Sequence, residues 1–347
     1  MNDIKKLIGR DSLTVAEVMQ KIDMNACGIL FLVRDNGTLV GCITDGDIRR
    51  YLLAGGRMTG AAVDAANTLP MTAKSEEEAK KIYYRENFII VPIVDNKGTV
   101  KAFYNGEGRQ VKEKASLNIP VVINAGGKGT RLDPFTRVLP KPLVPVGDIP
   151  IIEHIMKEYQ SYSCNKFHII VNYKRELMKA YFADNENHYN ITWYDEEKPL
   201  GTGGGLTFLR GKLKDTFFFA NCDALLTTNY ENMVKFHKEN GNIITMICAY
   251  KNLNIPYGVV EMGINGRIEN IKEKPSISFL TNTGIYIVEP EVIDDMEDGV
   301  PVGFPDVVER QRKKGEKVAV FPVSENDWMD MGQLPELEKM RIKLYGE

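Results

Sequence analysis

The chain has 347 residues, 43% of them hydrophobic and 26% charged, which is long enough for two domains and ordinary for a globular protein. The formal net charge of -3 argues against a broad nucleic-acid interface, and no apolar run approaches the about 20 residues that a membrane helix needs. The five cysteines are scattered and never form a Cys-x-x-Cys pair, which argues against a zinc site. Free thiols and the lack of a signal-peptide core predict a cytoplasmic protein with no nucleic-acid or membrane partner.

The first third of the chain contains an imperfect repeat. Residues 12–22 begin with a Ser/Thr cap and predict a helix, as do residues 75–85, which carry acidic side chains in their first turn. After each helix, two apolar runs are separated by an Asp-Asn turn with Gly and Thr, at Asp35 and at Asp95. Each copy therefore predicts a helix, a strand, a turn, a strand and a closing helix, and such copies usually bury a face against each other.

The run "GCITDGDIRRYL", residues 41–52, closes the first copy. It resembles the nucleotide-holding run of cystathionine-β-synthase (CBS) modules, so residues 1–116 are similar to a tandem CBS regulatory domain of α/β type. The resemblance implies that Thr44 and Asp47 hold the phosphate and ribose of an adenosine nucleotide, and that the chain forms a homodimer. The second copy reads "KAFYNGEGRQ" and lacks both residues, so at most one intact nucleotide site is expected. The alternative is a module that serves packing or dimerisation alone.

A polar stretch at residues 111–120 ends in proline and predicts the boundary to a second α/β domain at residues 120–347. That domain opens with a buried strand, residues 121–124, which runs into a glycine-rich turn. The turn lacks the spacing of the dinucleotide fingerprint and the Gly-Lys-Ser/Thr of the P-loop. Glycines nevertheless allow backbone amides to approach a phosphate chain closely.

Two basic residues follow this turn. Arg131 can neutralise phosphate with a fork of donors, and Lys141 lies between two prolines that stiffen its backbone. The whole stretch, "AGGKGTRL" followed by "PKPLVPV", resembles the signature of the sugar-1-phosphate nucleotidyltransferases, also called nucleotide-sugar pyrophosphorylases. The resemblance implies a Rossmann-like, GT-A-like domain with a mixed sheet.

Six further motifs resemble the same family, in the family's order. "EEKPLGTGGGL" at residues 196–206 is similar to its base-recognition segment, and "FFFANCDALL" and "DWMDMG" are similar to its two metal-binding aspartate motifs. An Asp after a strand can also cap a helix, so the order of the motifs carries the assignment. The implied nucleotide-binding residues are Ala125, Gly126, Gly127, Gly129, Thr130, Gly201 and Thr202. The implied sugar-phosphate contacts are Tyr257, Gly258, Glu273, Lys274, Asn282 and Thr283. The implied catalytic residues are Arg131, Lys141 and Asp223, and the implied Mg2+ ligands are Asp223 and Asp330.

The resemblance implies transfer of a nucleoside monophosphate from a nucleoside triphosphate (NTP) to a sugar 1-phosphate, with release of pyrophosphate. CBS modules ahead of such a domain resemble the guanylyltransferases that make GDP-glucosamine for legionaminic acid, which favours GTP and glucosamine 1-phosphate. A mannose-1-phosphate guanylyltransferase, or an enzyme that uses dTTP, UTP or CTP, is the alternative. A third hypothesis, from another class, is a catalytically silent nucleotide-sensing subunit.

Overall fold

The computed structural model describes residues 4–25, 27–86, 90–106, 114–183 and 189–346. The chain forms two compact units, a smaller one (Met1–Lys112 with Tyr250–Phe279) and a larger one (Glu113–Ala249 with Leu280–Glu347). The expected α/β fold class, with a mixed sheet in the larger unit, is confirmed. Among the described residues, no helix has the length and apolar character that crossing a membrane would require.

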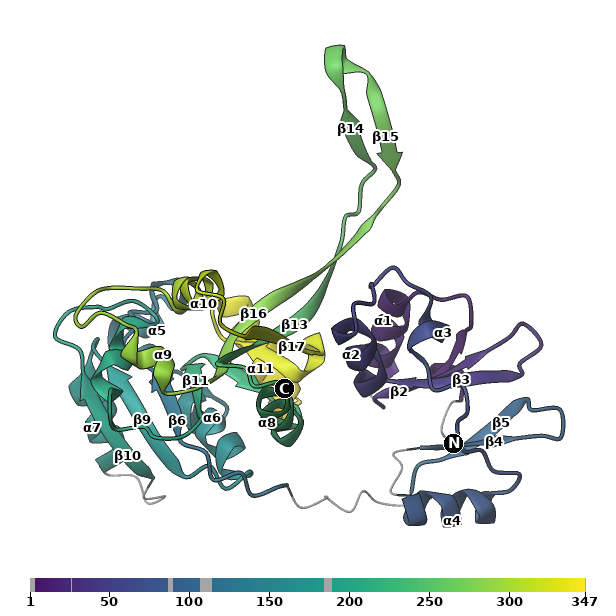
Figure 1. Ribbon diagram of the computed structural model, residues 1–347, viewed down its shortest axis with the longest axis horizontal. Coiled ribbons are helices and arrows are strands. Elements are labelled where there is room, and N and C mark those ends of the chain that lie inside the picture. The colour runs from purple at the N-terminus through teal and green to yellow at the C-terminus, as the bar shows by residue number, and fades with distance from the viewer. Residues whose placement is uncertain (1–3, 26, 87–89, 107–113, 184–188, 347) are drawn as a thin grey trace. The chain divides into compact units, whose positions relative to one another are not determined.

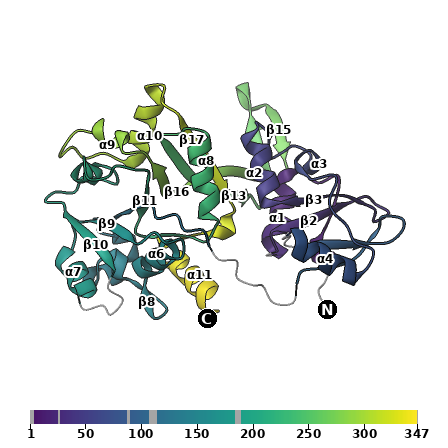
Figure 2. The same cartoon turned by 60° about the horizontal axis from the view of Figure 1, so that its bottom comes forward.

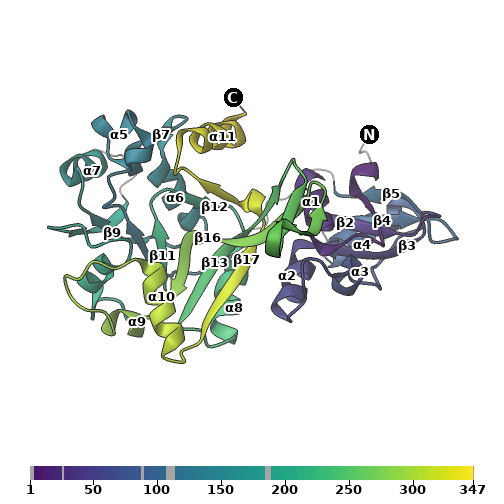
Figure 3. The ribbon, with the colours of Figure 1, turned by 90° about the horizontal axis from the view of Figure 1, so that it is seen from above.

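The smaller unit contains the sequence repeat (Figure 3, purple to blue). In the first copy, strands β2 and β3 are antiparallel, and a short strand, β1, runs parallel to β2. The second copy repeats the helix and the antiparallel hairpin, whereas its expected closing helix would fall on residues 107–113, outside the described residues. The elements of the two copies are β1 (Ile8–Arg10), α1 (Val15–Asn25), β2 (Ile29–Val33), β3 (Leu39–Thr44), α2 (Asp45–Leu53), α3 (Ala62–Ala65), α4 (Glu76–Glu86), β4 (Val91–Val94) and β5 (Val100–Tyr104).

The two predicted turns pair with each other. Asp95 accepts hydrogen bonds from the backbone amides of Lys97 and Thr99 at 2.8 and 2.9 Å, which is ordinary Asx-turn chemistry. Thr38 of the first turn forms an antiparallel bridge with Thr99 of the second. The repeat therefore brings its copies together at their hairpin turns, as a paired repeat requires.

The larger unit is built on a seven-stranded sheet with the order β10-β9-β6-β11-β16-β13-β17, whose two edge strands are visible in Figure 2. Strand β6 lies between β9 and β11 and runs parallel to both, whereas β16 is antiparallel to β11. The carboxyl ends of the three parallel strands therefore lie at one edge of the sheet, which is where α/β folds bind ligands. The strands are β6 (Val121–Asn124), β9 (Lys166–Val171), β10 (Asn190–Asp195), β11 (Phe217–Asn221), β13 (Ile244–Asn254), β16 (Ser276–Val288) and β17 (Val318–Val323).

Apolar side chains alternate between the two faces of this sheet, because successive residues of a strand point in opposite directions. One face packs against α6 (Ile151–Gln160), α7 (Arg175–Ala183), α8 (Tyr230–Glu239) and α11 (Leu334–Tyr345). The other packs against a 3-10 turn, η4 (Gly204–Leu209), with α9 (Glu291–Asp294) and α10 (Phe304–Lys313) (Figure 1). The first face carries Val121, Ile123, Phe218, Ala220, Ile285 and Ile287, and the second carries Val122, Phe217, Phe219, Tyr286 and Val288.

A buried polar cluster joins α8 to the sheet. His237 is fully buried, and its ring nitrogens lie 2.8 Å from Thr245 Oγ1 and 2.9 Å from Glu289 Oε1. The Thr216 hydroxyl also donates to Glu289, at 2.7 Å. These hydrogen bonds satisfy groups whose burial would otherwise be costly, so the cluster stabilises the larger unit.

Replacing His237 by leucine is expected to lower the stability of the larger unit by about 2–3 kcal/mol, because Glu289 and Thr245 lose a buried partner. The two tryptophans, Trp193 and Trp328, both lie in this unit, so urea unfolding followed by tryptophan fluorescence measures the change. Lys238→Met, at the exposed neighbouring position, is the control and should change stability by less than about 0.5 kcal/mol. Equal stabilities of the His237 variant and the control would contradict this role.

Candidate active site

The glycine turn after β6 is shaped by contacts of Gly129 with Lys141 and Thr136. Gly129 has a φ of 65°, and a Cβ placed on it would come within 2.8 Å of Lys141 Cβ. The Thr136 hydroxyl donates to the Gly129 carbonyl at 3.0 Å and so stabilises the turn. Only glycine fits such a position without strain, so Gly129 makes the tight turn possible, and phosphate binding by the turn residues Ala125–Thr130 stays a prediction.

A second glycine segment lies against the end of β6. Asn124, the last residue of that strand, donates from Nδ2 to the Thr202 carbonyl at 3.1 Å and to the Gly201 carbonyl at 3.4 Å. Gly201 has a φ of 78°, and a Cβ there would lie 2.6 Å from the Val302 carbonyl oxygen. The structure thus brings the predicted phosphate turn and the predicted base segment together, although they are far apart in the sequence.

The two predicted metal ligands lie side by side. Asp223 follows β11 at its carboxyl end and precedes a short strand, β12 (Ala224–Leu226). Strand β12 pairs antiparallel with β18 (Trp328–Asp330), which sets Ala224 opposite Asp330, and the Met331 amide donates to the Asp223 carbonyl at 2.9 Å. We call this pair of strands the carboxylate ribbon, because it carries both aspartates.

Two cations face the carboxylates. Lys141 forms an ion pair with Asp223, and the two side chains are 11% and 16% exposed. Burial and the charge of Asp223 raise the pKa of Asp330, whereas the charges of Lys141 and Arg131 oppose that shift. Arg131, Lys141, Asp223 and Asp330 therefore form one electrostatic cluster at the sheet edge.

The carboxylate pair suits magnesium. Among the described residues there is no group of three or more His, Cys, Asp or Glu side chains that could hold a metal ion. Mg2+ does not need one, since it is commonly held by one or two carboxylates and completed by substrate phosphates and water. Oxygen ligands from Asp223 and Asp330, placed beside a phosphate-binding turn, fit that pattern, and the magnesium remains a prediction.

The first residue of the predicted base segment, Glu196, was not singled out in the sequence, and its buried carboxylate lies between Gly126 and Gly205. Glu196 is 3% exposed, and a Cβ on Gly126 would come within 2.9 Å of its Oε2, while a Cβ on Gly205 would come within 2.6 Å of its Oε1. Within the described part of the chain, Oε1 is buried without a hydrogen-bond partner, and burial raises the pKa of Glu196 to about 7. The signal in the sequence was its place as the first residue of the base segment, directly after the strand "NITWYD".

The predicted sugar-phosphate contacts are divided between the units. Tyr257, Gly258, Glu273 and Lys274 belong to the segment around the hairpin of β14 (Val259–Met262) and β15 (Ile268–Lys272), which groups with the smaller unit. Tyr257 is 74% exposed. A Cβ on Gly258 would lie 3.0 Å from Glu273 Oε2, so Gly258 and Glu273 are close across the hairpin. The role of all four at a sugar site stays a prediction.

Asn282 and Thr283 belong to the larger unit. The Asn282 side chain donates to the Tyr286 hydroxyl at 2.6 Å and accepts from the Gly284 amide at 2.9 Å. The buried Thr283 hydroxyl donates to the Ile247 carbonyl at 2.8 Å. Thr283 therefore has a structural contact within the sheet, whereas the exposed Asn282 is the better placed of the two for a ligand.

Thr44 and Asp47, the predicted regulatory pair, form a capping box at the start of α2. The Thr44 hydroxyl donates to Asp47 Oδ2 at 2.6 Å, the Thr44 amide donates to the same oxygen at 2.9 Å, and Arg50 pairs with Asp47. This arrangement stabilises the helix by itself, so the motif has a structural explanation beside the nucleotide one.

Known proteins are similar to both parts of the chain. The CBS domain model matches residues 10–54, the first copy of the repeat. The relatives include probable mannose-1-phosphate guanylyltransferase 2 of Oryza sativa subsp. japonica, 34% identical over 221 residues (61% of each chain). They also include UTP–glucose-1-phosphate uridylyltransferase of Synechocystis, 31% identical over 240 residues (62% of this chain, 60% of the relative). The chain thus spans about 60% of the length of these curated relatives.

Solved structures share the fold of the larger unit. A putative glucose-1-phosphate thymidylyltransferase from Bacillus anthracis is 22% identical, with a TM-score of 0.52 over 64% of this chain and 94% of that chain. HddC from Yersinia pseudotuberculosis is 21% identical, with a TM-score of 0.51 over 65% of this chain and 99% of that chain. The nucleotidyl transferase family model matches residues 120–345, which is most of the chain. The chain therefore belongs to the nucleotidyl transferase family.

Proposed function

We propose that this protein transfers a nucleoside monophosphate from an NTP to a sugar 1-phosphate and releases pyrophosphate. The observation that carries the proposal is the cluster of two cations and two carboxylates beside the glycine turn. All four side chains are present, which argues against a catalytically silent subunit.

The reaction joins two anions, so positioning and charge neutralisation are the main tasks of the site. A phosphate oxygen of the sugar 1-phosphate forms a bond to the α-phosphorus, and the bond from that phosphorus to the bridging oxygen breaks. The electron pair leaves with pyrophosphate, which Arg131 binds, and Lys141 orients the acceptor phosphate. The attacking oxygen is already ionised at neutral pH, so no general base is needed. Mg2+ held by Asp223 and Asp330 would neutralise charge on the α-phosphate.

We propose that the nucleotide is GTP, on the basis of Glu196. The pairing edge of guanine presents two adjacent donors, N1–H and the N2 amino group, and an ionised carboxylate is a pure acceptor with two oxygens. Uracil and thymine present one donor between two acceptors, which a carboxylate matches less well. The buried Glu196 begins the base segment and lies against Gly126 of the phosphate turn, and it supports guanine for this reason.

Replacing Glu196 by glutamine is expected to lower kcat/KM for GTP by about 100-fold or more and to improve UTP or dTTP relative to GTP. The amide keeps the shape of the side chain but offers one donor and one acceptor, which suits uracil and thymine. Steady-state rates with both nucleotides check this. Glu197→Gln, the exposed neighbour, is the control. An unchanged GTP preference in the Glu196 variant would contradict base recognition by this residue.

The raised pKa of Glu196 gives a second test. Because the folded-state value is about 7 and the ordinary value is 4.5, ionisation of Glu196 lowers stability as the pH rises between these values. Glu196→Gln is therefore expected to raise the melting temperature of the nucleotide-free protein at pH 8, and the difference should shrink at pH 5. For the wild type we expect KM for GTP to rise below pH 7 as Glu196 is protonated, and in the same variant this rise should be absent. A variant that is less stable at pH 8 would contradict the assignment.

The acceptor that we propose is glucosamine 1-phosphate, as in guanylyltransferases of legionaminic acid biosynthesis, with mannose 1-phosphate as the second candidate. The name of the Oryza sativa relative includes mannose 1-phosphate as the sugar phosphate, and that of the Synechocystis relative includes UTP and glucose 1-phosphate. A panel of five nucleotides (GTP, dTTP, UTP, CTP and ATP) against glucosamine, mannose, glucose and N-acetylglucosamine 1-phosphates separates them by pyrophosphate release. Highest kcat/KM with GTP and glucosamine 1-phosphate is expected, and highest kcat/KM with UTP would contradict the base assignment.

We also propose that an adenosine nucleotide binds the smaller unit at Thr44 and Asp47 and alters turnover, in a homodimer. Calorimetric titration of the full chain with AMP, ADP and ATP tests binding, with Asp47→Ala as the variant that should lose it. Binding that survives in this variant would place the nucleotide elsewhere.

A further inference from the structure

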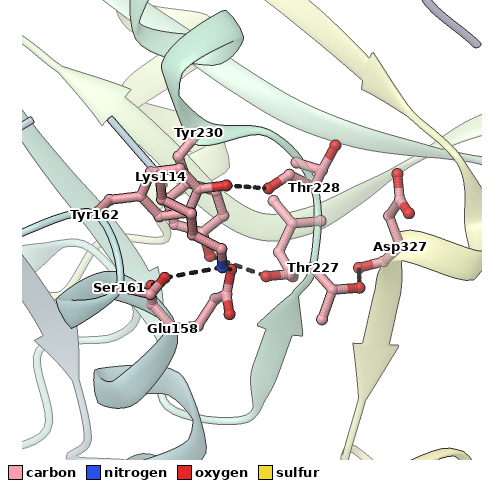
Figure 4. A network of polar contacts seen from close by, with 9 residues as sticks. Lys114, Glu158, Ser161, Tyr162, Thr227, Thr228, Tyr230 and Asp327 are labelled. Carbon is pink, nitrogen blue, oxygen red and sulfur yellow. Dashed lines mark hydrogen bonds and ion pairs between the residues drawn. The ribbon is translucent and has the colours of Figure 1, made fainter. Parts of the chain in front are cut away.

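Lys114, the first described residue of the larger unit, is held by a group of contacts within that unit. Lys114 donates from Nζ to Glu158 Oε1 at 2.6 Å and to the Ser161 hydroxyl at 2.8 Å (Figure 4). The same ammonium group lies 4.6 Å from the centre of the Tyr162 ring, within cation–π range. Three residues on, the Leu117 amide donates to the Tyr162 carbonyl at 2.8 Å. We call Lys114, Glu158, Ser161 and Tyr162 the linker clamp.

The clamp is partly shielded from water. The side chains of Lys114 and Glu158 are 35% and 19% exposed. Burial raises the pKa of Glu158, and the hydrogen bond and charge of Lys114 oppose that shift. Removing Lys114 would therefore leave a partly buried carboxylate without its cation, which is the costly way to break such a pair.

The clamp contacts the segment that follows the carboxylate ribbon. The Tyr162 hydroxyl donates to the Thr228 carbonyl at 3.1 Å, and its ring stacks on Tyr230 with 4.8 Å between centroids and 3° between planes (Figure 4). Tyr230, the first residue of α8, donates in turn to the carbonyl of Leu226, the last residue of β12, at 3.1 Å. Tyr162 and Tyr230 are 5% and 1% exposed, so this contact has little freedom to shift.

Hydrogen bonds of the carboxylate ribbon complete the series of contacts from Lys114 to the two aspartates. The Thr227 amide donates to the Asp327 carbonyl at 2.8 Å, and the Met331 amide donates to the Asp223 carbonyl at 2.9 Å. Between these two bonds, β12 and β18 set Asp223 and Asp330 beside each other. The path from Lys114 to the two carboxylates is thus made of direct contacts and paired strands, the kind of network that carries coupling.

We propose that Lys114 is a positioning residue, which holds the carboxylate ribbon in place through Tyr162 and Tyr230. This makes the start of the larger unit an input to the catalytic centre: a displacement of Lys114 is transmitted to Asp223 and Asp330. The expected effect of Lys114 on turnover rests on the proposed transferase function. Its expected effect on the carboxylate ribbon does not.

The test uses the full chain with Lys114→Met, Lys114→Arg and Lys212→Met. Lys212 is the matched control, because its ammonium group also lies 4.6 Å from a tyrosine ring, that of Tyr194 on the edge strand β10. Arginine can bind Glu158 and cover the Tyr162 ring, so it should restore the clamp.

Hydrogen exchange of the Thr227 and Met331 amides, without substrate or metal, reports on the ribbon directly. Lys114→Met is expected to speed exchange at both amides about tenfold and to lower kcat about 3- to 30-fold, with Lys114→Arg near the wild type and Lys212→Met unchanged. Unchanged exchange in Lys114→Met, or a change equal to that of Lys212→Met, would overturn the proposal whatever the turnover. A protein that turns over no substrate pair but shows the exchange effect would overturn the proposed function alone.

Discussion

Replacing Asp223 by asparagine is expected to lower kcat by about 1,000-fold or more, because the site loses a charge that balances the metal at the reacting phosphate. The amide keeps the size of the side chain but cannot neutralise Mg2+ or Lys141. Binding of Mn2+ to the free protein, followed by electron paramagnetic resonance, should weaken as well, and this readout does not depend on turnover.

Asp215→Asn is the matched control for that substitution. Asp215 is exposed and precedes β11, whereas Asp223 follows the same strand at its other end. The control should keep kcat within about twofold of the wild type. If Asp223→Asn retained full turnover and Mn2+ binding, neither the metal role nor the proposed cluster would stand.

Replacing Lys141 by methionine is expected to raise KM for the sugar 1-phosphate at least about tenfold and to lower kcat about 100-fold. Lys141 is nearly buried against Asp223, so its loss removes the fixed cation that orients the acceptor phosphate. The neighbouring carboxylates would then lack a competing cation, and Mn2+ binding to the free protein should be retained or tightened. The pattern therefore differs from that of Asp223→Asn, which loses the metal.

Lys179→Met controls for the loss of a lysine ion pair. Lys179 pairs with Asp195 at 2.7 Å, with side chains 30% and 38% exposed, and such pairs contribute little. An unchanged KM for the sugar 1-phosphate in Lys141→Met, or a loss of Mn2+ binding there, would contradict the role given to Lys141.

Local features of the sequence predicted the start of the site well. The strand at residues 121–124, the glycine turn after it and the position of Asp223 after an apolar strand are all found in the structure. Each depends on short-range effects: strand alternation, the φ values that glycine allows and the length of an apolar run. The hairpin turns at Asp35 and Asp95 were predictable for the same reason.

Long-range pairing could not be predicted from local patterns. The contact between β12 and β18, which sets Asp223 beside Asp330, joins segments from the middle and the end of the larger unit. The burial of Glu196 and the clamp at Lys114 depend on tertiary packing in the same way. Thr283 matched the family motif, yet its hydroxyl is bonded within the sheet, because a motif identifies a residue type and not the direction of its side chain.

The central claim, attack of a sugar phosphate oxygen on the α-phosphorus of an NTP, is tested most directly by isotope tracing. A sugar 1-phosphate labelled with 18O at all of its phosphate oxygens is incubated with GTP and Mg2+, and both products are analysed by mass spectrometry. All of the label should appear in the nucleotide sugar and none in pyrophosphate, since the leaving group takes its bridging oxygen from GTP. Labelled pyrophosphate, or pyrophosphate release without any nucleotide sugar, would contradict the account.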